Sequence, residues 1–473
     1  MNATYSMDHL QAVAHVGAIL NATNANAGGA AVNRPKTANT SHYDATGQTV
    51  ATASTTSYEG VSFGSDGSIT GGSLSHQSVS PEGIKLHTTA VNFQADGKPA
   101  SASIDVHNLH SDGDFKKIAM DLSGATWNDG YNISSGQVKV TATDPNTQAT
   151  LHEGTIQFDK EALVSGSFTH YDPQNGGAVS GHAEIDYAGA KFLGTSIVGG
   201  QYSIRSLNPD KTLSATSVVS VSPLGRLDSV ETTNVGPDSA VKTKVKVDFS
   251  KVQFNARNEF DSGDLLYTVQ DDKGTKLSET AVTYKGAVPS LSQTLVYQDN
   301  ALSSKIMIDY TGAAFNNQNQ VVNSSKKVDV YGADNKLVSS SMVTYDERGQ
   351  KLKPGAAAKV HGAPAPPARV PVPVLGKAFA LPPADPNQTQ QTDKKNRPDG
   401  TLQQVRVTTL VAGKPVSALV TAYAADGTTV VKTYTLDLTG ISFDENAKTV
   451  SGALNMQTHL GGNILHAASS IQY

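Results

Sequence analysis

Asp121-Leu122-Ser123-Gly124-Ala125-Thr126-Trp127 indicates how the chain is organised, because similar segments recur along its whole length. Its marker is a glycine followed three residues later by an aromatic residue. The marker occurs as Gly60 to Phe63, Gly124 to Trp127, Gly189 to Phe192, Gly312 to Phe315 and Gly440 to Phe443, with Lys251 to Phe254 in the same phase. The aromatic residues are spaced by 64, 65, 62, 61 and then 128 residues, and 128 is twice 64. The spacing predicts tandem units of about 64 residues.

A second marker supports the same period. Halfway through the interval of 128 residues stands Gly376-Lys377-Ala378-Phe379, in phase with the other units. About 30 residues after each marker aromatic, a strand-like segment ends on another aromatic residue, at Phe93, Phe158, Tyr284, Tyr345 and Tyr473, with Val221 and Leu410 as weaker equivalents. We therefore expect seven units from about residue 39 onward, with the sixth badly eroded.

Each unit reads as four strands joined by short turns. In the last unit we expect strands over 416–424, 429–443, 450–459 and 463–473, with turns at Asp426-Gly427 and Gly461-Gly462. Links this short make neighbouring strands antiparallel, so each unit is a meander. The predicted fold class is all-β: seven tandem four-stranded meanders in an elongated stack or continuous sheet. A seven-bladed β-propeller is the alternative.

The marker glycine is expected at a bulge or bend. Before Gly440 the apolar residues Tyr434, Leu436 and Leu438 share one parity, whereas Ile441 and Phe443 after it have the opposite parity. Since strand side chains alternate between faces, the apolar set changes face at the glycine. The Asp three residues before the marker glycine recurs as Asp121, Asp186, Asp248, Asp309 and Asp437, and we expect it to accept hydrogen bonds from backbone amides there. A calcium ladder along the units is the functional alternative.

The segments outside the regular units divide the chain into four parts. Residues 1–38 form an N-terminal segment, 39–350 five repeats, 351–411 the degenerate sixth repeat and 412–473 the seventh. Within the first part a helix is expected over about 9–20, capped by Asp8 and Gln11. It is either a frayed leader or a docking helix for a neighbouring molecule; its apolar run has the size of a signal peptide, but no Lys or Arg precedes it and His15 interrupts it.

Proline sets the sixth unit apart. Residues 351–402 contain ten of the twenty prolines of the chain. Proline cannot donate a hydrogen bond to a sheet, so this part is expected to run extended over the surface, as a spacer or as a polyproline-type recognition ligand.

Composition excludes several classes of partner. The 473 residues carry a net charge of −5 without a basic run, which argues against nucleic acid or an anionic membrane as the main partner. The chain has no cysteine, so disulfides and thiolate metal sites are impossible. No stretch approaches the roughly 20 apolar residues of a membrane span. The low hydrophobic fraction of 38% indicates exposed sheet and tight turns more than a thick core.

No recognisable catalytic motif occurs, and we expect no catalytic, cofactor-binding or metal-binding residue. The one cluster of ligand-type residues runs from His107 to Asp114 and includes His110; a solvated hairpin turn is favoured there over a metal site. Tyr43-Asp44-Ala45-Thr46-Gly47 and Tyr345-Asp346-Glu347-Arg348-Gly349 resemble the tyrosine-aspartate repeats of bacterial Rhs-type shells, and the meanders resemble sheet proteins of lipopolysaccharide transport. Each resemblance covers a few residues per unit, and neither assigns a family.

Three functions are compatible with these features. The first is a structural, self-assembling extracellular protein: a fibre, surface-layer or biofilm-matrix subunit at the cell surface. Adhesion is a further role that such a subunit could have. Its copies would join head to tail through unpaired edges near residue 40 and at 463–473. The second is a non-catalytic module that binds a surface glycan or a lipid, against which the single Trp and 6% aromatic residues count. The third is an enzyme at the His107/His110 hairpin. We expect the first.

Overall fold

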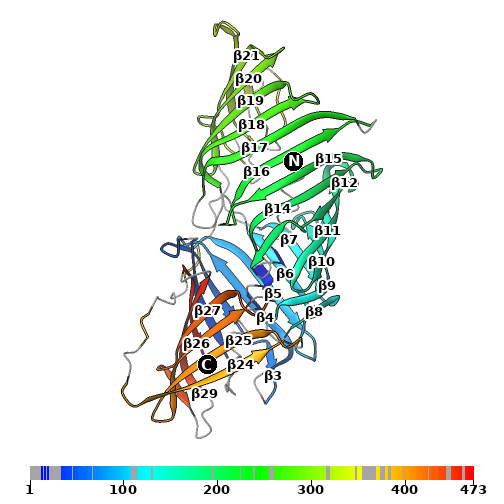
Figure 1. Ribbon diagram of the computed structural model, residues 1–473. Helices are drawn as coiled ribbons and strands as arrows, with labels where there is room; N and C mark the ends of the chain where they lie inside the picture. The colour runs from blue at the N-terminus through cyan, green and yellow to red at the C-terminus, as the bar shows by residue number, and fades with distance from the viewer. Residues whose placement is uncertain are drawn as a thin grey trace.

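The computed structural model shows one antiparallel sheet of thirty strands (Figure 1). It describes residues 12–13, 15–17, 19–20, 34–44, 46–65, 68–107, 114–128, 131–193, 196–223, 225–237, 240–254, 260–315, 320–346, 349–353, 369–372, 379–381, 385–397, 399–423, 426–443, 449–460 and 464–473. The all-β meander is confirmed. Neighbouring units are hydrogen-bonded to each other, as β5 is to β6 and β10 is to β11, so they form a continuous sheet and not the separate blades of a propeller.

Six of the seven units have four strands, or five where the bulge at the marker glycine divides the second strand, and the described residues of the sixth unit have two. The first three units comprise β1 Thr37–Tyr43, β2 Val50–Ser57, β3 Val61–Phe63, β4 Ile69–Val79, β5 Lys85–Phe93; β6 Pro99–His107, β7 Asp114–Asp121, β8 Ala125–Trp127, β9 Ile133–Thr143, β10 Thr150–Asp159; and β11 Ala162–Asp172, β12 Ala178–Asp186, β13 Ala190–Leu193, β14 Ser196–Leu207, β15 Leu213–Val221. A 3-10 turn, η1 Pro173–Asn175, joins β11 to β12.

The fourth to seventh units follow the same plan except where proline interrupts it. They comprise β16 Leu227–Val235, β17 Val241–Phe254, β18 Phe260–Asp271, β19 Lys276–Lys285; β20 Val288–Gln298, β21 Ala301–Asp309, β22 Ser325–Gly332, β23 Leu337–Thr344; β24 Gln388–Asn396, β25 Leu402–Val411; and β26 Lys414–Tyr423, β27 Val430–Asp437, β28 Ile441–Phe443, β29 Thr449–Leu460, β30 Ile464–Gln472. In the described residues the sixth unit has β24 and β25 alone, and most of its prolines lie before β24, in the part that was expected to be eroded.

The marker glycine lies at a bulge, as its parity change predicts. In the second unit Asp121 lies opposite Lys139 and Ala125 opposite Gly136, so residues 122–124 face only residues 137–138 of β9. The amide of Ala125 donates to the carbonyl of Leu122 at 3.1 Å, which closes a tight turn within the bulge. The same bulge separates β2 from β3, β12 from β13 and β27 from β28. It therefore recurs with the repeat.

A second glycine series explains why the repeat is so regular. Gly136 has a φ of +95°, and a Cβ placed there would lie 2.2 Å from the carbonyl oxygen of Gly124. The residues at the equivalent position are Gly72, Gly200, Gly263 and Gly452, whose Cβ would meet a backbone oxygen at 2.2 or 2.3 Å. Only glycine fits where the two backbones approach this closely. The strand-end residues Phe93, Phe158, Val221 and Tyr284 lie directly opposite members of this series.

The helix packs inside the protein. Residues 12, 13, 15–17, 19 and 20 are helical, and Val13, Val16 and Leu20 are buried in one core with Leu74, Met120 and Ile204 of the sheet. This core spans the first three units, and a second, smaller core joins the first and seventh units around Leu436, Met456 and Ile471. The alternative that this helix docks on a neighbouring molecule was therefore wrong, because its apolar face is buried within its own chain.

Beyond the third unit the sheet has little covering. From β16 to β23 only Leu265, Pro289, Ser292 and Val321 are buried among the described residues. Cross-strand pairs stabilise this single layer instead. Examples are the hydroxyl pair Thr280–Thr294 at 2.9 Å and the ammonium of Lys305 lying 4.4 Å from the centre of the Tyr331 ring. The low hydrophobic content of the chain is consistent with this sparsely buried part of the sheet.

Lys351 and Leu352, at the start of the Pro-rich segment, pair with the end of β23, and between residues 369 and 381 the segment touches the sheet at two further described places. The amide of Val370 donates to the carbonyl of Gly83 at 2.9 Å, and the side-chain amide of Gln457 donates to the carbonyl of Phe379 at 2.8 Å. Between these two contacts, one residue from each of the strands β4, β2, β1, β30 and β29 lies opposite its neighbour in a row across the sheet. All five residues of this row are buried: Val79, Ala53, Ser41, Ala468 and Gln457. The segment is therefore anchored on both sides of the junction between β1 and β30.

Candidate functional site: the open edges of the sheet

The edges predicted near residue 40 and at 463–473 are not open. Strand β1 pairs with β30 along its length, from Thr37 opposite Gln472 to His42 opposite Ala467. The hydroxyl groups of Thr40 and Ser469 are hydrogen-bonded across this junction at 2.9 Å. The prediction of head-to-tail pairing through these strands was wrong. The sheet ends instead where the prolines interrupt the sixth unit, so β23 and β24 are its edges.

These two edges lie far apart. In Figure 1, β21 lies at the top of the molecule, two strands from β23, whereas β24 lies near the bottom. Separation in one view is a minimum, since depth can only increase it. The edges therefore cannot pair with each other within one chain, and each needs its own explanation.

Strand β23 is an uncharged edge that exposes large apolar side chains. Leu337 is 56% exposed, Val338 70% and Met342 63%. The segment from 337 to 344 contains no charged residue, and among the described residues 337–343 pair only with β22. Natural edges usually carry charges, prolines or bulges that prevent pairing with another chain. Strand β23 has neither charges nor prolines; its one irregularity against β22 is a bulge at Val338, because Ser339 lies opposite Val330 and Leu337 opposite Tyr331.

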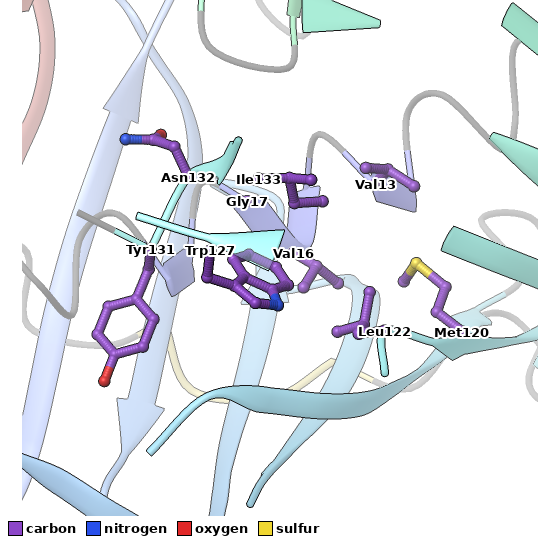
Figure 2. Close-up of a pocket in the computed structure, with 9 residues that line it drawn as sticks. All are labelled: Val13, Val16, Gly17, Met120, Leu122, Trp127, Tyr131, Asn132 and Ile133. Atoms are coloured by element: carbon purple, nitrogen blue, oxygen red, sulfur yellow. The ribbon is translucent and has the colours of Figure 1, made fainter. Parts of the chain in front are cut away.

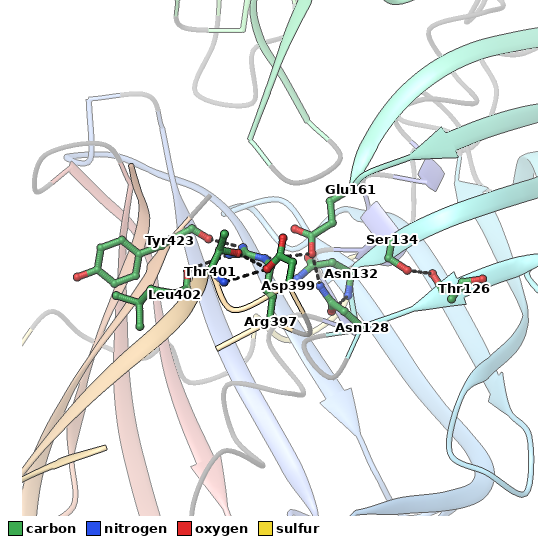
Figure 3. Close-up of polar contacts among 10 residues, drawn as sticks. All are labelled: Thr126, Asn128, Asn132, Ser134, Glu161, Arg397, Asp399, Thr401, Leu402 and Tyr423. Atoms are coloured by element: carbon green, nitrogen blue, oxygen red, sulfur yellow. Dashed lines mark hydrogen bonds and ion pairs between the residues drawn. The ribbon is translucent and has the colours of Figure 1, made fainter. Parts of the chain in front are cut away.

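Strand β24 is polar, charged and partly tied down. It reads Gln388 to Asn396 and includes Asp393, Lys394 and Lys395, all exposed. The turn after it is anchored by Arg397, whose side chain is 11% exposed. The guanidinium donates to the carbonyls of Leu402 at 2.9 Å and Tyr423 at 2.8 Å (Figure 3).

Arg397 also reaches a distant part of the repeat. Its Nε lies 3.6 Å from Oε1 of Glu161, in the turn between β10 and β11. The same carboxylate oxygen accepts a hydrogen bond from the side-chain amide of Asn128 at 2.8 Å (Figure 3). The end of β24 is thus fixed against the second and third units of its own chain, which leaves β23 as the freer edge.

A cluster of histidines lies at the junction of the first and last units. His15 of the helix donates to or accepts from the hydroxyl of Thr89 at 3.0 Å, and its ring centre lies 5.4 Å from that of His76 and 5.1 Å from that of His87. His42 and His466 face each other across the β1–β30 pair with ring centres 6.2 Å apart. Residues far apart in sequence therefore form one polar cluster.

Burial keeps these histidines neutral. It lowers the pKa of His42 to about 4 and is the main cause that lowers the pKa of His76 and of His466 to about 3. Repulsion from His42 and Lys432 lowers the pKa of His466 further. The pKa of His15 is lowered well below its usual value by burial and by the neighbouring histidines. The cluster is suited to a polar, uncharged interior.

The apolar hollow beside the helix is small. Val13, Val16 and Gly17 line it from the helix, and Met120, Leu122 and Trp127 line it from the sheet (Figure 2). Its free space is no more than that of about one water molecule, far less than a sugar ring or an acyl chain requires. This hollow gives no support to a glycan or lipid site.

The repeated aspartates act on the backbone, as expected. Each accepts a hydrogen bond from the amide two residues later within the bulge: Asp121 from Ser123 at 3.0 Å, Asp186 from Ala188 at 2.9 Å, Asp248 from Ser250 at 2.8 Å, Asp309 from Thr311 at 2.8 Å and Asp437 from Thr439 at 3.0 Å. Hydrogen bonds from the hydroxyl group and the amide of the residue two positions later together lower the pKa of Asp121, Asp248 and Asp309. The carboxylates thus accept hydrogen bonds from backbone amides that would otherwise have no acceptor within the bulge.

The His107 hairpin does not form a described site. His107 lies 2.8 Å from the hydroxyl of Thr88, whereas His110 and the rest of 108–113 lie outside the described residues. In the described part of the chain, no three His, Asp or Glu side chains are grouped so that they could hold a metal ion. Nor does any described helix have the length and apolarity to cross a membrane.

No family model matches the chain, and neither does any curated protein. Among solved structures, the chain is similar to the crystal structure of TcdB2-TccC3-TEV at 9% identity, with a TM-score of 0.16 over 87% of this chain and 24% of that chain. It is similar to TcdB2-TccC3 at 8% identity, with a TM-score of 0.10 over 84% of this chain and 28% of the other. The chain thus spans about a quarter of the length of either, and similarity this low assigns neither fold nor function.

The second glycine series and the edge strand β23 are both visible in the sequence, although the Gly-x-x-aromatic marker does not include them. The glycines at 72, 136 and 200 recur at intervals of 64, and Gly263 follows after 63. Strand β23 contains Leu-Val-Ser-Ser-Ser-Met-Val-Thr, an uncharged segment directly before the Pro-rich region. A search for uncharged strands next to an interrupted unit would have found this edge.

Proposed function

We propose that the protein is a structural, non-catalytic protein that self-assembles outside the cell, as a fibre or surface-layer subunit. One observation carries this proposal: strand β23 is an edge without charge that exposes Leu337, Val338 and Met342. Such an edge offers backbone donors and acceptors together with apolar side chains, which favours the addition of a strand from another chain.

The rest of the molecule is consistent with a scaffold. The most repeated charged residue, Asp121 and its equivalents, is engaged by backbone amides within the bulge. The long single-layer sheet from β16 to β23 presents a large surface with little buried core. A location outside the cell, at its surface or in a matrix, belongs to this proposal because an exposed Ser/Thr-rich sheet suits a structural role there.

The test is the mass of the purified protein over a wide range of concentration. We expect association that increases with concentration in sedimentation velocity and ordered assemblies in electron microscopy. A double variant, Val338→Lys with Met342→Lys, should remain monomeric because buried lysines at a strand pair would be desolvated without partners.

The matched control is Val218→Lys. Val218 is 43% exposed but lies in β15, which is paired on both sides with β14 and β16. This variant should associate like the unaltered protein. Compact monomers at every concentration, or equal loss of association in both variants, would refute the proposal.

A further inference from the structure

We infer that one face of the sheet from β16 to β22 packs against the same face of a second copy of the chain. This inference rests on the proposed self-assembly and adds a second contact to it, between chains that β23 has already joined. The face is apolar, carries no charge and lies outside the core of its own chain.

The two faces of this part of the sheet differ in charge. Residues directly opposite each other on neighbouring strands share a face. One row of such residues runs from Val230 of β16 through Val247, Tyr267 and Ile306 to Val330 of β22. Neither this row nor the rows on its two sides, from Thr232 to Gly332 and from Leu265 to Val328, contain a charged residue. We call these three rows the apolar face.

The opposite face of the same strands carries the charges. A single row there contains Glu231, Lys246, Glu279 and Lys305. This charged face is suited to water, whereas burial of the apolar face against another apolar surface would remove hydrocarbon from water.

The apolar face continues the core-facing side of the first three units. Tyr202 and Val219 belong to the main core and lie in line with Val230. Among the described residues, this core and the side chains packed against it extend to Val230 and include none from β17 to β23. The sheet extends further as a twisted layer, away from the helix that packs into the first units (Figure 1).

Hydroxyl groups within the apolar face already have partners. Thr280 and Thr294, at its centre, are hydrogen-bonded to each other at 2.9 Å, and Thr232 is bonded to Ser217 at 2.8 Å. Burying these groups therefore does not leave them without a hydrogen bond. Because the face has no charge, a second copy meets neither like-charge repulsion nor an unpaired buried charge. These properties suit a dry contact between two copies of the same face.

The area of the apolar face makes this contact secondary to the edge. Each residue covers roughly 33 Å² of one face, since the repeat is about 6.8 Å along a strand and about 4.8 Å between strands. The three rows then bury about 1,200 Å² in total between two copies, which is the lower limit for a specific interface. Such a contact is weak alone. Chains joined through β23 present several of these faces together, which raises the effective concentration of each for its partner.

Two neighbouring residues of β21 provide a variant and its matched control. Ile306 lies in the central row of the apolar face, whereas Met307 lies on the charged face, opposite Asp329. Ile306→Lys should retain association through β23 but lose the largest species in sedimentation velocity, because its ammonium would be desolvated without a partner in the face contact. Met307→Lys should match the unaltered protein. One size distribution shared by all three proteins would overturn the inference.

A thiol at the same two positions tests the contact without adding a charge. The chain has no cysteine, so Ile306→Cys and Met307→Cys each introduce a single thiol. On assembly, maleimide labelling should slow by roughly tenfold or more for Ile306→Cys, because a packed contact excludes the reagent, and should not change for Met307→Cys. If the protein assembles but position 306 is labelled as fast as in dilute protein, the face contact is wrong while assembly through β23 stands. If the unaltered protein is monomeric at every concentration, both proposals fail.

Discussion

Replacing Gly136 by alanine should disrupt the second unit far more than the same change at Gly274. Both glycines have a similar positive φ, +95° and +86°. A Cβ at Gly136 would lie 2.2 Å from the oxygen of Gly124 and 3.2 Å from Cα of Ala125, whereas a Cβ at Gly274 has no atom within 4 Å. The pair therefore separates the steric contact from the backbone conformation.

The expected magnitude follows from these contacts. A left-handed conformation costs alanine about 1–2 kcal/mol, which the reduced freedom of the unfolded chain partly offsets. At Gly136 the backbones must also separate by about 1 Å, which strains the bulge by about 1–3 kcal/mol. It further weakens the hydrogen bond from the amide of Gln137 to Gly124, now 3.0 Å. We expect Gly136→Ala to lose about 3–5 kcal/mol and Gly274→Ala about 1 kcal/mol.

The assay is urea unfolding followed by tryptophan fluorescence. Trp127 is the only tryptophan of the chain and lies in β8, paired with the strand that contains Gly136. A local probe is needed because long repeat arrays lose cooperativity between distant units. The midpoint should fall by about 1 M or more for Gly136→Ala. Equal midpoints for the two variants would refute the explanation of the glycine series.

Two further predictions concern the buried polar groups. The pKa values of His42, His76 and His466 lie at about 4, 3 and 3 in the folded protein, below the ordinary 6.5, so the unfolded chain binds more protons and stability falls as pH decreases from about 7. Between pH 7 and pH 5 each of these histidines should lower the free energy of unfolding by about 2 kcal/mol. A thermal unfolding midpoint that does not change over this range would contradict their burial as neutral groups. Asp121→Ala should lose about 1 kcal/mol by removing the acceptor for the Ser123 amide, whereas Asp121→Asn retains an acceptor and should lose less; equal losses in urea unfolding would argue against that bond.

The sequence allowed prediction of what is local and repeated. The change of parity around Gly440 indicates the bulge, and the aspartate before it was expected to accept backbone hydrogen bonds; both depend on residues within a few positions of each other. The proline count places the interruption in the sixth unit. Short turns between alternating segments predict the antiparallel meander. These inferences use physical rules that operate over one or two strands.

Contacts between distant residues could not be predicted in this way. The pairing of β1 with β30 joins residues more than 400 positions apart, and no periodicity identifies it. This pairing moves the open edges from the chain ends to β23 and β24. The histidine cluster likewise draws on His15, His76 and His466, which share no motif. The candidate site was therefore missed, although the open form of the sheet was expected.

Hydrogen exchange at low and high protein concentration tests assembly through β23. Because β1 and β30 pair within one chain, we expect their amides to be protected at every concentration. The peptide containing 337–344 should exchange rapidly when dilute and slowly when concentrated, while β24 changes less. Exchange in 337–344 that is independent of concentration in a protein that associates would contradict assembly through this edge.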